Sequence, residues 1–195
     1  EAVAKVAADY ENLVYLILGK THPCVKESSG EKYRQSLMDL AEELGVKNNI
    51  RFIDKYLTKE EVITYLHLSD MYLTPYLSKE QAVSGTLAYA MGCGRVIIST
   101  PYRYAEEMLG GGRGLLADFK DSDSMAACIR SVLENPTQKA EMERKTLAVG
   151  QTMSWANVAA QYTELALHTM RPFSSSSQKS HPHLSSASRN GLRMM

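Results

Sequence analysis

The segment with the clearest chemical potential is Ser84-Gly85-Thr86, at the start of a run of small and apolar residues. Such a run predicts a helix, and the first backbone N–H groups of a helix have no partner inside it. These N–H groups and the positive end of the helix dipole attract anions, and a glycine lets a phosphate approach the backbone closely. Ordinary capping of the helix by Ser84 explains the same residues about as well. The segment therefore predicts either a phosphate site or a simple helix cap.

Two further polar segments follow apolar runs. The first, Gly19-Lys20-Thr21-His22, combines a glycine with a cation, a hydroxyl and an imidazole, which together can meet an anionic ligand. A plain turn with a surface lysine is the competing interpretation, since no P-loop pattern surrounds it. In the second, Tyr56 either stacks on a base or packs within its loop. Arg113, in the glycine-rich turn Gly110–Gly114, is a weaker candidate for an anionic ligand.

Histidines and cysteines do not form a recognisable site. None of the histidines has a Ser/Asp or Cys partner at an interpretable spacing, so no triad and no metal cluster is predicted. The three cysteines, Cys24, Cys93 and Cys128, are far apart and give no disulfide framework. This usage of cysteine favours a reducing compartment, and we expect a cytoplasmic protein.

The elements that must position these residues alternate between short apolar runs and stretches of helical period. The runs are continuous and rich in Ile, Leu, Val and Tyr, as expected for strands covered on both faces. Capping-box patterns at Ser28 and Thr58 each begin a helical stretch, and an amphipathic stripe follows Asp121. The alternation predicts an α/β fold, a doubly wound parallel sheet flanked by helices, with ligands at the carboxyl ends of its strands. The expected strands are 13–18, 50–53, 71–75, 96–99 and 114–117.

Charge divides the chain into two parts. The 195 residues hold 22 basic and 22 acidic side chains, and this neutrality gives no support for a nucleic-acid partner. Residues 171–195 hold four basic residues, no acidic one and eight serines, so we expect a disordered basic tail there. The folded domain is expected over 1–170, ending in a helix capped by Ser154 with Trp155 and Tyr162 facing inward. No signal peptide and no transmembrane segment is expected, since no apolar run is long enough to span a membrane.

The stretch from Gln81 to Thr100, with Gly112-Arg113-Gly114-Leu115-Leu116 after it, resembles a known family. It is similar to the C-terminal, donor-binding half of GT-B glycosyltransferases of family four, the "group 1" transferases. The similarity covers roughly residues 1–168 and is most specific over 70–117. The resemblance implies a Rossmann-like fold and a nucleotide sugar, such as a UDP- or GDP-sugar, as donor. It also implies retaining, metal-independent transfer without a cofactor, with the acceptor held by an N-terminal domain.

The resemblance also assigns donor-binding residues to three segments of this sequence. The loop Gly19–His22 would border the diphosphate and the donor sugar. The loop that contains Tyr56 and Leu57 would line the nucleobase pocket. The backbone of Ser84, Gly85 and Thr86 would cradle the diphosphate, which agrees with the expectation for a helix terminus.

Two glutamates eight residues apart are typical of the family, and neither is present here. Their positions fall on Gln81, beside the donor sugar, and on Tyr89, beside the ribose. Gln81 can still hydrogen-bond a sugar hydroxyl, whereas Tyr89 lacks the bidentate carboxylate. Glu80 lies one residue from the first position. We therefore take Gln81 and Glu80 as candidate catalytic residues and Tyr89 as a candidate donor-binding residue.

These departures leave three functions open. The first is an active glycosyltransferase, of which this chain supplies the donor-binding half. The second is a non-catalytic nucleotide-, sugar- or partner-binding module, and the third is a nucleotide-sugar epimerase of the same architecture. The resemblance further implies that the family's first strand, central in the order 3-2-1-4-5-6, and the acceptor domain are missing from the chain. Alone, the fragment is expected to be inactive and marginally stable, because strand edges beside the gap would be exposed.

Overall fold

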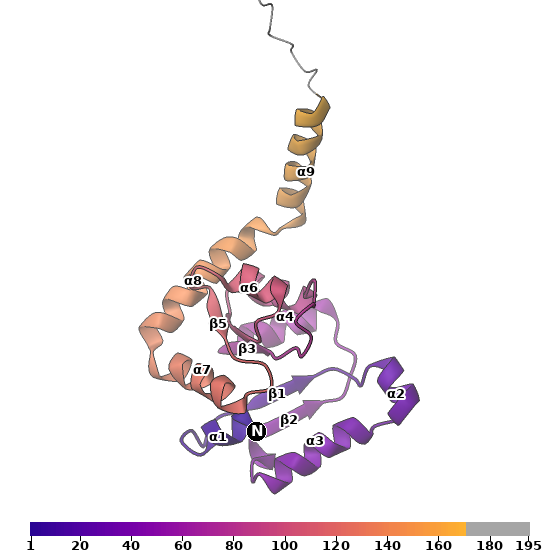
Figure 1. The fold of residues 1–195 in the computed structure, drawn as a ribbon, viewed down its shortest axis with the longest axis vertical. Coiled ribbons are helices and arrows are strands. Elements are labelled where there is room, and N and C mark those ends of the chain that lie inside the picture. Colours follow the sequence, from indigo (N-terminus) through magenta and orange to yellow (C-terminus); the bar gives the residue numbers. More distant parts are fainter. Residues whose placement is uncertain (171–195) are drawn as a thin grey trace, which may run out of the picture. The chain divides into compact units, whose positions relative to one another are not determined.

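The computed structural model describes residues 1–170, in which short parallel strands alternate with helices (Figure 1). The described residues divide between two units, the first Glu1–Val158 and the second beginning at Ala159. All five predicted apolar runs form strands, and the predicted bounds are wrong by two residues at most. The strands are β1 (Tyr15–Leu18), β2 (Ile50–Ile53), β3 (Met71–Thr74), β4 (Val96–Ser99) and β5 (Gly114–Leu116).

Helices connect the strands and follow the last one. The first unit holds α1 (Ala2–Ala7), α2 (Pro23–Ser29), α3 (Lys32–Glu43), the short 3-10 helix η1 (Lys47–Asn49), α4 (Lys59–Leu68), α5 (Gly85–Gly92), α6 (Arg103–Leu109), α7 (Ser122–Glu134) and α8 (Pro136–Thr152). The last helix, α9 (Trp155–Met170), begins in the first unit and continues in the second. Within residues 1–170, no helix combines the length and the apolarity needed to cross a membrane.

The strands form two parallel sheets. One contains β1 and β2, with Leu16 opposite Arg51, and the other has the order β3-β4-β5, with Leu73 opposite Ile98. Parallel strands joined through helices confirm the predicted α/β class. In the part of the chain that the structure describes, no strand pairs with the second edge of β1 or of β3.

Strand β4 is the centre of the core and is buried along its whole length. Successive side chains of a strand point to opposite faces, and those of β4 enter two different clusters. Val96 and Ile98 pack with residues of α1 and α7, and Ile97 packs with residues of α5 and α6. Helices therefore cover both faces of this sheet, which explains why its strands are continuous apolar runs.

Helix α5 crosses α8 at a position that only glycine can occupy. A Cβ atom at Gly150 would overlap the backbone of Met91 and Gly92. Gly114 is under a similar constraint in β5, where a Cβ would lie 2.5 Å from the carbonyl oxygen of Ile97. Both glycines fix how closely neighbouring elements pack.

Two local predictions are wrong. Ser28 does not begin a helix; it lies near the end of α2, and α3 begins after Glu31. Pro23 at the first position of a helix, with the His22 side chain as N-cap, starts the earlier helix instead. Trp155 and Tyr162 do not face inward, since they are 86% and 71% exposed. An apolar period predicts one apolar face, but a covering surface is also needed to bury it.

Two capping predictions are confirmed. At Thr58, the side chain accepts from the N–H of Glu61, and the Glu61 carboxylate accepts from the N–H of Thr58. Ser154 accepts a hydrogen bond from the N–H of Asn157 at 3.3 Å. The predicted basic tail, 171–195, lies outside the described residues.

Candidate functional site

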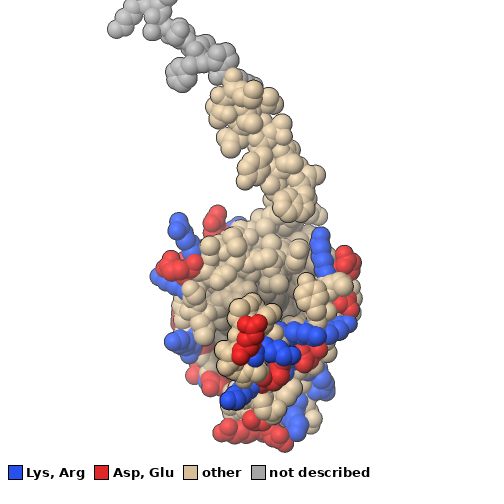
Figure 2. Space-filling model, turned by 90° about the vertical axis from the view of Figure 1, so that its right-hand side faces the viewer, with Lys and Arg blue, Asp and Glu red and all other residues tan. Residues whose placement is uncertain are grey.

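The three segments that the sequence marks as donor-binding follow the carboxyl ends of strands. Gly19–His22 follows β1, Asp54–Leu57 follows β2, and residues 75–84 connect β3 to α5. In Figure 1 the arrows of β1 and β2 point to the right, and Figure 2 looks onto that side. Lysine, arginine, aspartate and glutamate side chains are intermixed there around an uncharged area (Figure 2). This side of the first unit carries the loops where ligands of parallel α/β domains bind.

The N-terminus of α5 has the features of an anion site as well as those of a capped helix. Ser84 is the N-cap, 4% exposed, and its Oγ accepts from the N–H of Leu87 at 3.3 Å. The N–H groups of Gly85 and Thr86 take part in no hydrogen bond within residues 1–170. A Cβ at Gly85 would meet no atom within 4 Å, so the space beside it is open. The two interpretations of Ser84-Gly85-Thr86 are thus compatible, because the cap uses one N–H and leaves two for a ligand.

Tyrosine hydroxyls surround this helix terminus. Tyr72, in β3, donates to Thr86 Oγ1 at 2.6 Å, and the Tyr76 hydroxyl lies 3.5 Å from Ser84 Oγ. The ring of Tyr76 lies against that of Tyr102, with centroids 5.2 Å apart. Burial raises the pKa of Tyr72, and the nearby Tyr76 and Tyr102 phenols raise it further, so Tyr72 is a neutral donor at pH 7. Sequence reasoning missed Tyr72, because a tyrosine in an apolar run looks like a packing residue, and it missed Tyr76, in the loop after that run.

In the loop after β1, two of the four candidate residues hold the loop itself. Thr21 Oγ1 donates to Glu31 Oε2 at 2.6 Å, and this hydrogen bond is the main reason why the pKa of Glu31 is lowered. His22 caps α2, with its Nδ1 accepting from the N–H of Cys24 at 3.3 Å. Gly19 has a φ of +116°, a conformation that favours glycine. Lys20 is the exposed cation of this loop.

The loop after β2 presents an aromatic side chain. Tyr56 is 83% exposed, so the alternative that it packs within its loop is wrong. Leu57 is half-buried beside it. Lys55 pairs with Glu61 at 2.6 Å and Asp54 pairs with Arg34 at 3.0 Å, which anchors the two residues before Tyr56. An exposed ring on an anchored loop can stack on a base.

Gln81, Glu80 and Tyr89 are not gathered into a carboxylate site. The Gln81 side-chain amide donates to the carbonyl oxygen of Val83 at 2.8 Å, within the same loop. Glu80 is exposed. Tyr89, on α5, is 40% exposed, and the ammonium of Lys59 lies 5.8 Å from the centre of its ring. At these positions the chain offers an amide, an isolated carboxylate and a phenol next to a cation.

Two other polar segments have structural roles. Arg113 Nη2 donates to the carbonyl oxygen of Glu107 at 2.8 Å, so its guanidinium closes the end of α6 and is not free for an anionic ligand. No Mg²⁺-binding D-x-D pattern is expected from the sequence, and that expectation is wrong, since Asp121 and Asp123 form a D-x-D triplet with a spacing that would suit a divalent cation. Asp121 Oδ1 caps α7, and Asp123 pairs with Lys5 at 2.6 Å. Both carboxylates are engaged within the protein.

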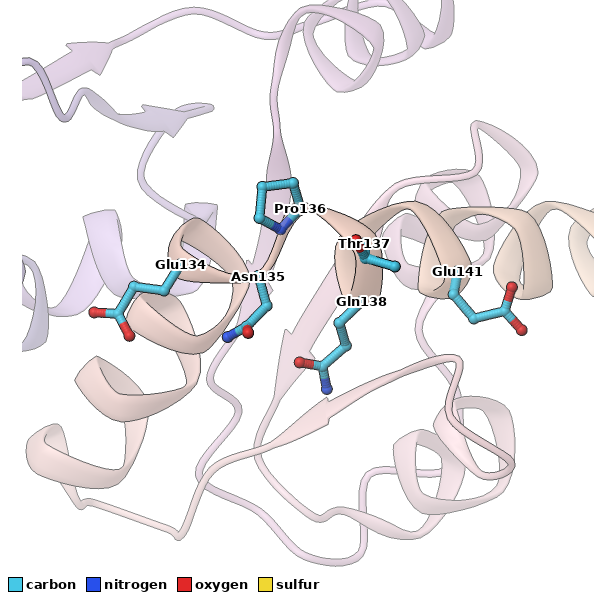
Figure 3. A pocket seen from close by; sticks show the side chains of 6 residues that line it. All are labelled: Glu134, Asn135, Pro136, Thr137, Gln138 and Glu141. Carbon is cyan, nitrogen blue, oxygen red and sulfur yellow. The ribbon is translucent and has the colours of Figure 1, made fainter.

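A surface hollow of about 520 Å³ lies at the junction of α7 and α8 (Figure 3). Its side chains do not converge on one point; Figure 3 shows Glu134, Gln138 and Glu141 pointing in different directions. Glu134 accepts a 3.4 Å hydrogen bond from Tyr10, which precedes β1, so the hollow lies near the amino ends of the strands. Ligands of parallel α/β sheets bind at the opposite edge, and we do not count this hollow as a candidate site. It is lined by Glu134, Asn135, Pro136, Thr137, Gln138 and Glu141.

Comparison with known proteins agrees with this architecture. Residues 1–148 match the family model of "Glycosyl transferases group 1". The chain is 27% identical over 138 residues to a D-inositol 3-phosphate glycosyltransferase of Corynebacterium urealyticum, which covers 70% of the chain and 32% of the relative. It is 29% identical over 161 residues to the enzyme of the same name from Corynebacterium glutamicum. This alignment covers 79% of the chain and 35% of that relative. The chain therefore spans about a third of the length of these curated relatives.

Solved structures share the fold. Anabaena Alr3699/HepE in complex with UDP superposes with a TM-score of 0.73 at 16% identity, covering 86% of this chain and 43% of that one. The C-terminal domain of a glycosyl transferase group 1 family protein, LpcC from Francisella tularensis, gives a TM-score of 0.66 at 15% identity, with coverages of 78% and 75%. These similarities confirm a Rossmann-like α/β fold of the kind found in GT-B glycosyltransferases. Since the family model matches most of the chain, the protein belongs to the group 1 glycosyl transferases.

Proposed function

We propose that the protein containing this chain transfers a sugar from a nucleotide-diphosphate donor, and that residues 1–158 supply the donor site. One observation supports this proposal most directly. At the start of α5, the N–H groups of Gly85 and Thr86 have no hydrogen-bond partner within residues 1–170, the hydroxyls of Ser84 and Thr86 lie beside them, and a Cβ at Gly85 would meet no atom within 4 Å. In a group 1 glycosyl transferase, a diphosphate is the anion that such a site would bind.

The chemical contribution of this site is electrostatic. When the bond between sugar and diphosphate breaks, negative charge grows on the leaving diphosphate. The N–H groups of Gly85 and Thr86 and the positive end of the α5 dipole would stabilise that charge without rearranging. Lys20 is exposed in the loop after β1 and would place its positive charge near the same diphosphate. Gln81 would hydrogen-bond a sugar hydroxyl, with Glu80 as a second candidate.

The nucleoside would contact the loop after β2 and the side of α5. Tyr56 is exposed enough to stack on a base, Leu57 lies beside it, and Tyr89 would lie next to the ribose. A uridine nucleotide is a suitable first probe, since the related fold of Anabaena Alr3699/HepE was solved with UDP and with UDP-glucose. The donor would thus extend from the base at Tyr56 to the diphosphate at α5.

The remaining features of the proposed activity concern the whole protein. We propose retaining transfer that needs no metal and no other cofactor, in line with the engagement of Asp121 and Asp123 within the chain. The acceptor would bind to a separate domain, and this chain alone would be inactive, as it spans about a third of the length of its relatives. All three cysteines are free thiols, which supports a reducing compartment such as the cytoplasm.

Calorimetric titration of the intact protein with UDP tests the donor site. Gly85→Val is the decisive variant, because a Cβ at this position would meet no atom within 4 Å and we expect the branched side chain to hinder a ligand from reaching the N–H groups. We expect UDP binding to be lost while the melting temperature stays close to that of the wild type. Gly92→Val, at the other end of the same helix and also in open space, is the matched control and should bind UDP normally. Unchanged affinity in Gly85→Val would contradict the proposal.

A non-catalytic binding module is the second candidate. It is favoured by the side chains at Gln81 and Tyr89, since the first bonds within its own loop and the second lies next to Lys59. Turnover separates the two functions: release of UDP from UDP-glucose in the presence of an acceptor extract would exclude the module. Tight UDP binding with no release under any condition would favour it.

A further inference from the structure

One side chain, Arg34, joins the two loops that follow β1 and β2. It lies in the first turn of α3, and 13% of its side chain is exposed. Its Nη2 donates to the carbonyl oxygen of Gly19 at 2.9 Å and lies 3.0 Å from Asp54 Oδ1. The N–H of Gly19 donates to the carbonyl oxygen of Ile53 at 3.1 Å. Gly19, the first residue of the loop after β1, is therefore held through both its N–H and its carbonyl oxygen. The same Arg34 Nη2 also reaches Asp54, in the loop after β2.

Glu31 extends this link to the rest of the first loop. Its Oε2 accepts from Thr21 at 2.6 Å and lies 3.5 Å from Arg34 Nε. Its Oε1 lies 3.4 Å from the ammonium of Lys26, on α2. Glu31 and Arg34, at the start of α3, thus attach both loops to that helix.

Stability of the fold does not account for this buried arginine. The Nε and Nη1 atoms of Arg34 are buried and have no hydrogen-bond partner within residues 1–170. Burial of guanidinium donors without hydrogen bonds is costly, and the attraction of Glu31 and Asp54, whose side chains are 45% and 56% exposed, is weakened by water. Because both carboxylates are exposed to this extent, water can solvate them when the guanidinium is replaced by an apolar side chain. Methionine has the length to bury the same surface as the arginine stem.

We propose that Arg34 is a positioning residue for donor binding, which holds Gly19–His22 and Asp54–Leu57 in one arrangement. The inference rests on the proposed function, which makes both loops part of the donor site. Loops that are already fixed lose less freedom when a ligand binds, so affinity depends on the link even though Arg34 does not contact the ligand. Its role differs from that of the N–H groups of α5, which would bind the diphosphate directly.

The test compares Arg34→Met with the wild type in the intact protein. We expect the melting temperature to stay the same or to rise, and amide hydrogen exchange in 19–22 and 54–57 to become faster. UDP affinity should fall by about tenfold, the effect of losing one ordered contact in a binding loop. Arg34→Lys should recover part of this affinity, because its ammonium can reach one of the two partners but lacks the planar fork.

Arg51→Met is the matched control. Arg51 lies on β2, at the other end of the strand from the loop, and is exposed. Its hydrogen bonds go to the carbonyl oxygens of Asn48 and Ile50, in its own segment. We expect loop exchange and UDP affinity to stay at wild-type values in this variant.

Two results would overturn the inference. One is a joint fall of melting temperature and UDP affinity in Arg34→Met, which would make the arginine a structural residue. The other is unchanged exchange in both loops. Hydrogen exchange is measured without nucleotide, so it tests the link between the loops independently of UDP binding. If the wild type bound no UDP, the proposed function would be contradicted. Faster loop exchange in Arg34→Met would still establish the link between the loops.

Discussion

The hydroxyl of Tyr72, in the middle of β3, donates a 2.6 Å hydrogen bond to the hydroxyl of Thr86, in the first turn of α5. A hydroxyl carries one proton and two lone pairs. Because Thr86 Oγ1 accepts from Tyr72, its own proton is available for Ser84, 3.4 Å away, or for a ligand. The interior of the sheet thereby orients a donor at the proposed anion site.

Tyr72→Phe should weaken binding of UDP by about fivefold, the effect of about 1 kcal/mol from one hydrogen bond. Thr86→Val should have a similar effect, and the double variant should be no weaker than either single one, because both changes remove the same oriented donor. Calorimetric titration with UDP measures all three. Tyr10→Phe is the control, because the Tyr10 hydroxyl contacts Glu134 near the amino ends of the strands. Additive losses in the double variant would show that Tyr72 acts independently of Thr86.

Gly150→Ala should destabilise the protein by about 3 kcal/mol, because the new Cβ would overlap the backbone of Met91 and force α5 and α8 apart. Gly92→Ala, at the C-terminal end of α5, would place its Cβ in open space and should change stability by less than about 1 kcal/mol. Chemical denaturation of the intact protein gives both values. Equal stability of the two variants would contradict the packing described for this helix pair.

The salt bridge between Glu61 and Lys55 should contribute to stability in a pH-dependent way. Hydrogen bonding to Lys55, followed by that to the Thr58 backbone, lowers the pKa of Glu61 from 4.5. A lowered carboxyl pKa stabilises the fold above the unfolded pKa, and this stabilisation is lost as the pH falls through the folded value. Glu61→Gln should therefore melt below the wild type at pH 7, and the difference should disappear under acidic conditions. Glu60→Gln, at an exposed neighbouring position in the same helix turn, is the control for removal of a carboxylate alone.

The isolated chain should be marginally stable. Strands β1 and β3 each pair on one edge within residues 1–170, and unpaired parallel edges promote association. We expect the isolated 195-residue chain to melt at low temperature and to form aggregates detectable by light scattering. A sharp, reversible transition at high temperature would count against this expectation.

The strands were predictable because helices cover both faces of β4, and side chains in such an environment are apolar without interruption. The amphipathic stripe of α7 was predictable for a related reason, since Met125, Ile129 and Val132 all enter the core. The start of α3 was not, because Pro23 and His22 formed a competing helix start nearby. The exposure of Trp155 was not predictable either, since periodicity does not report whether a covering surface exists.

Of the site, the sequence predicted the segments rather than the contacts. Ser84-Gly85-Thr86 has the expected place at a helix terminus. The contacts of Tyr72 and Arg34 were not predictable, because their partners are distant in the sequence. Tyr72 contacts Thr86, and Arg34 contacts Gly19 and Asp54. No local pattern marks a residue whose partner is supplied by another element.

The glycine contact between α5 and α8 has a mechanical consequence for the opposite end of α5. A helix of eight residues is about 12 Å long, so Gly85 lies within that distance of the crossing at Met91 and Gly150. Rotation of the helix about that fixed point by a few degrees would shift the N–H groups of Gly85 and Thr86 by a sizeable fraction of a hydrogen-bond length. The close packing of α5 on α8 at one end thus limits how far the N–H groups at the other end can move. The position of α8 thereby determines the orientation of the proposed anion site.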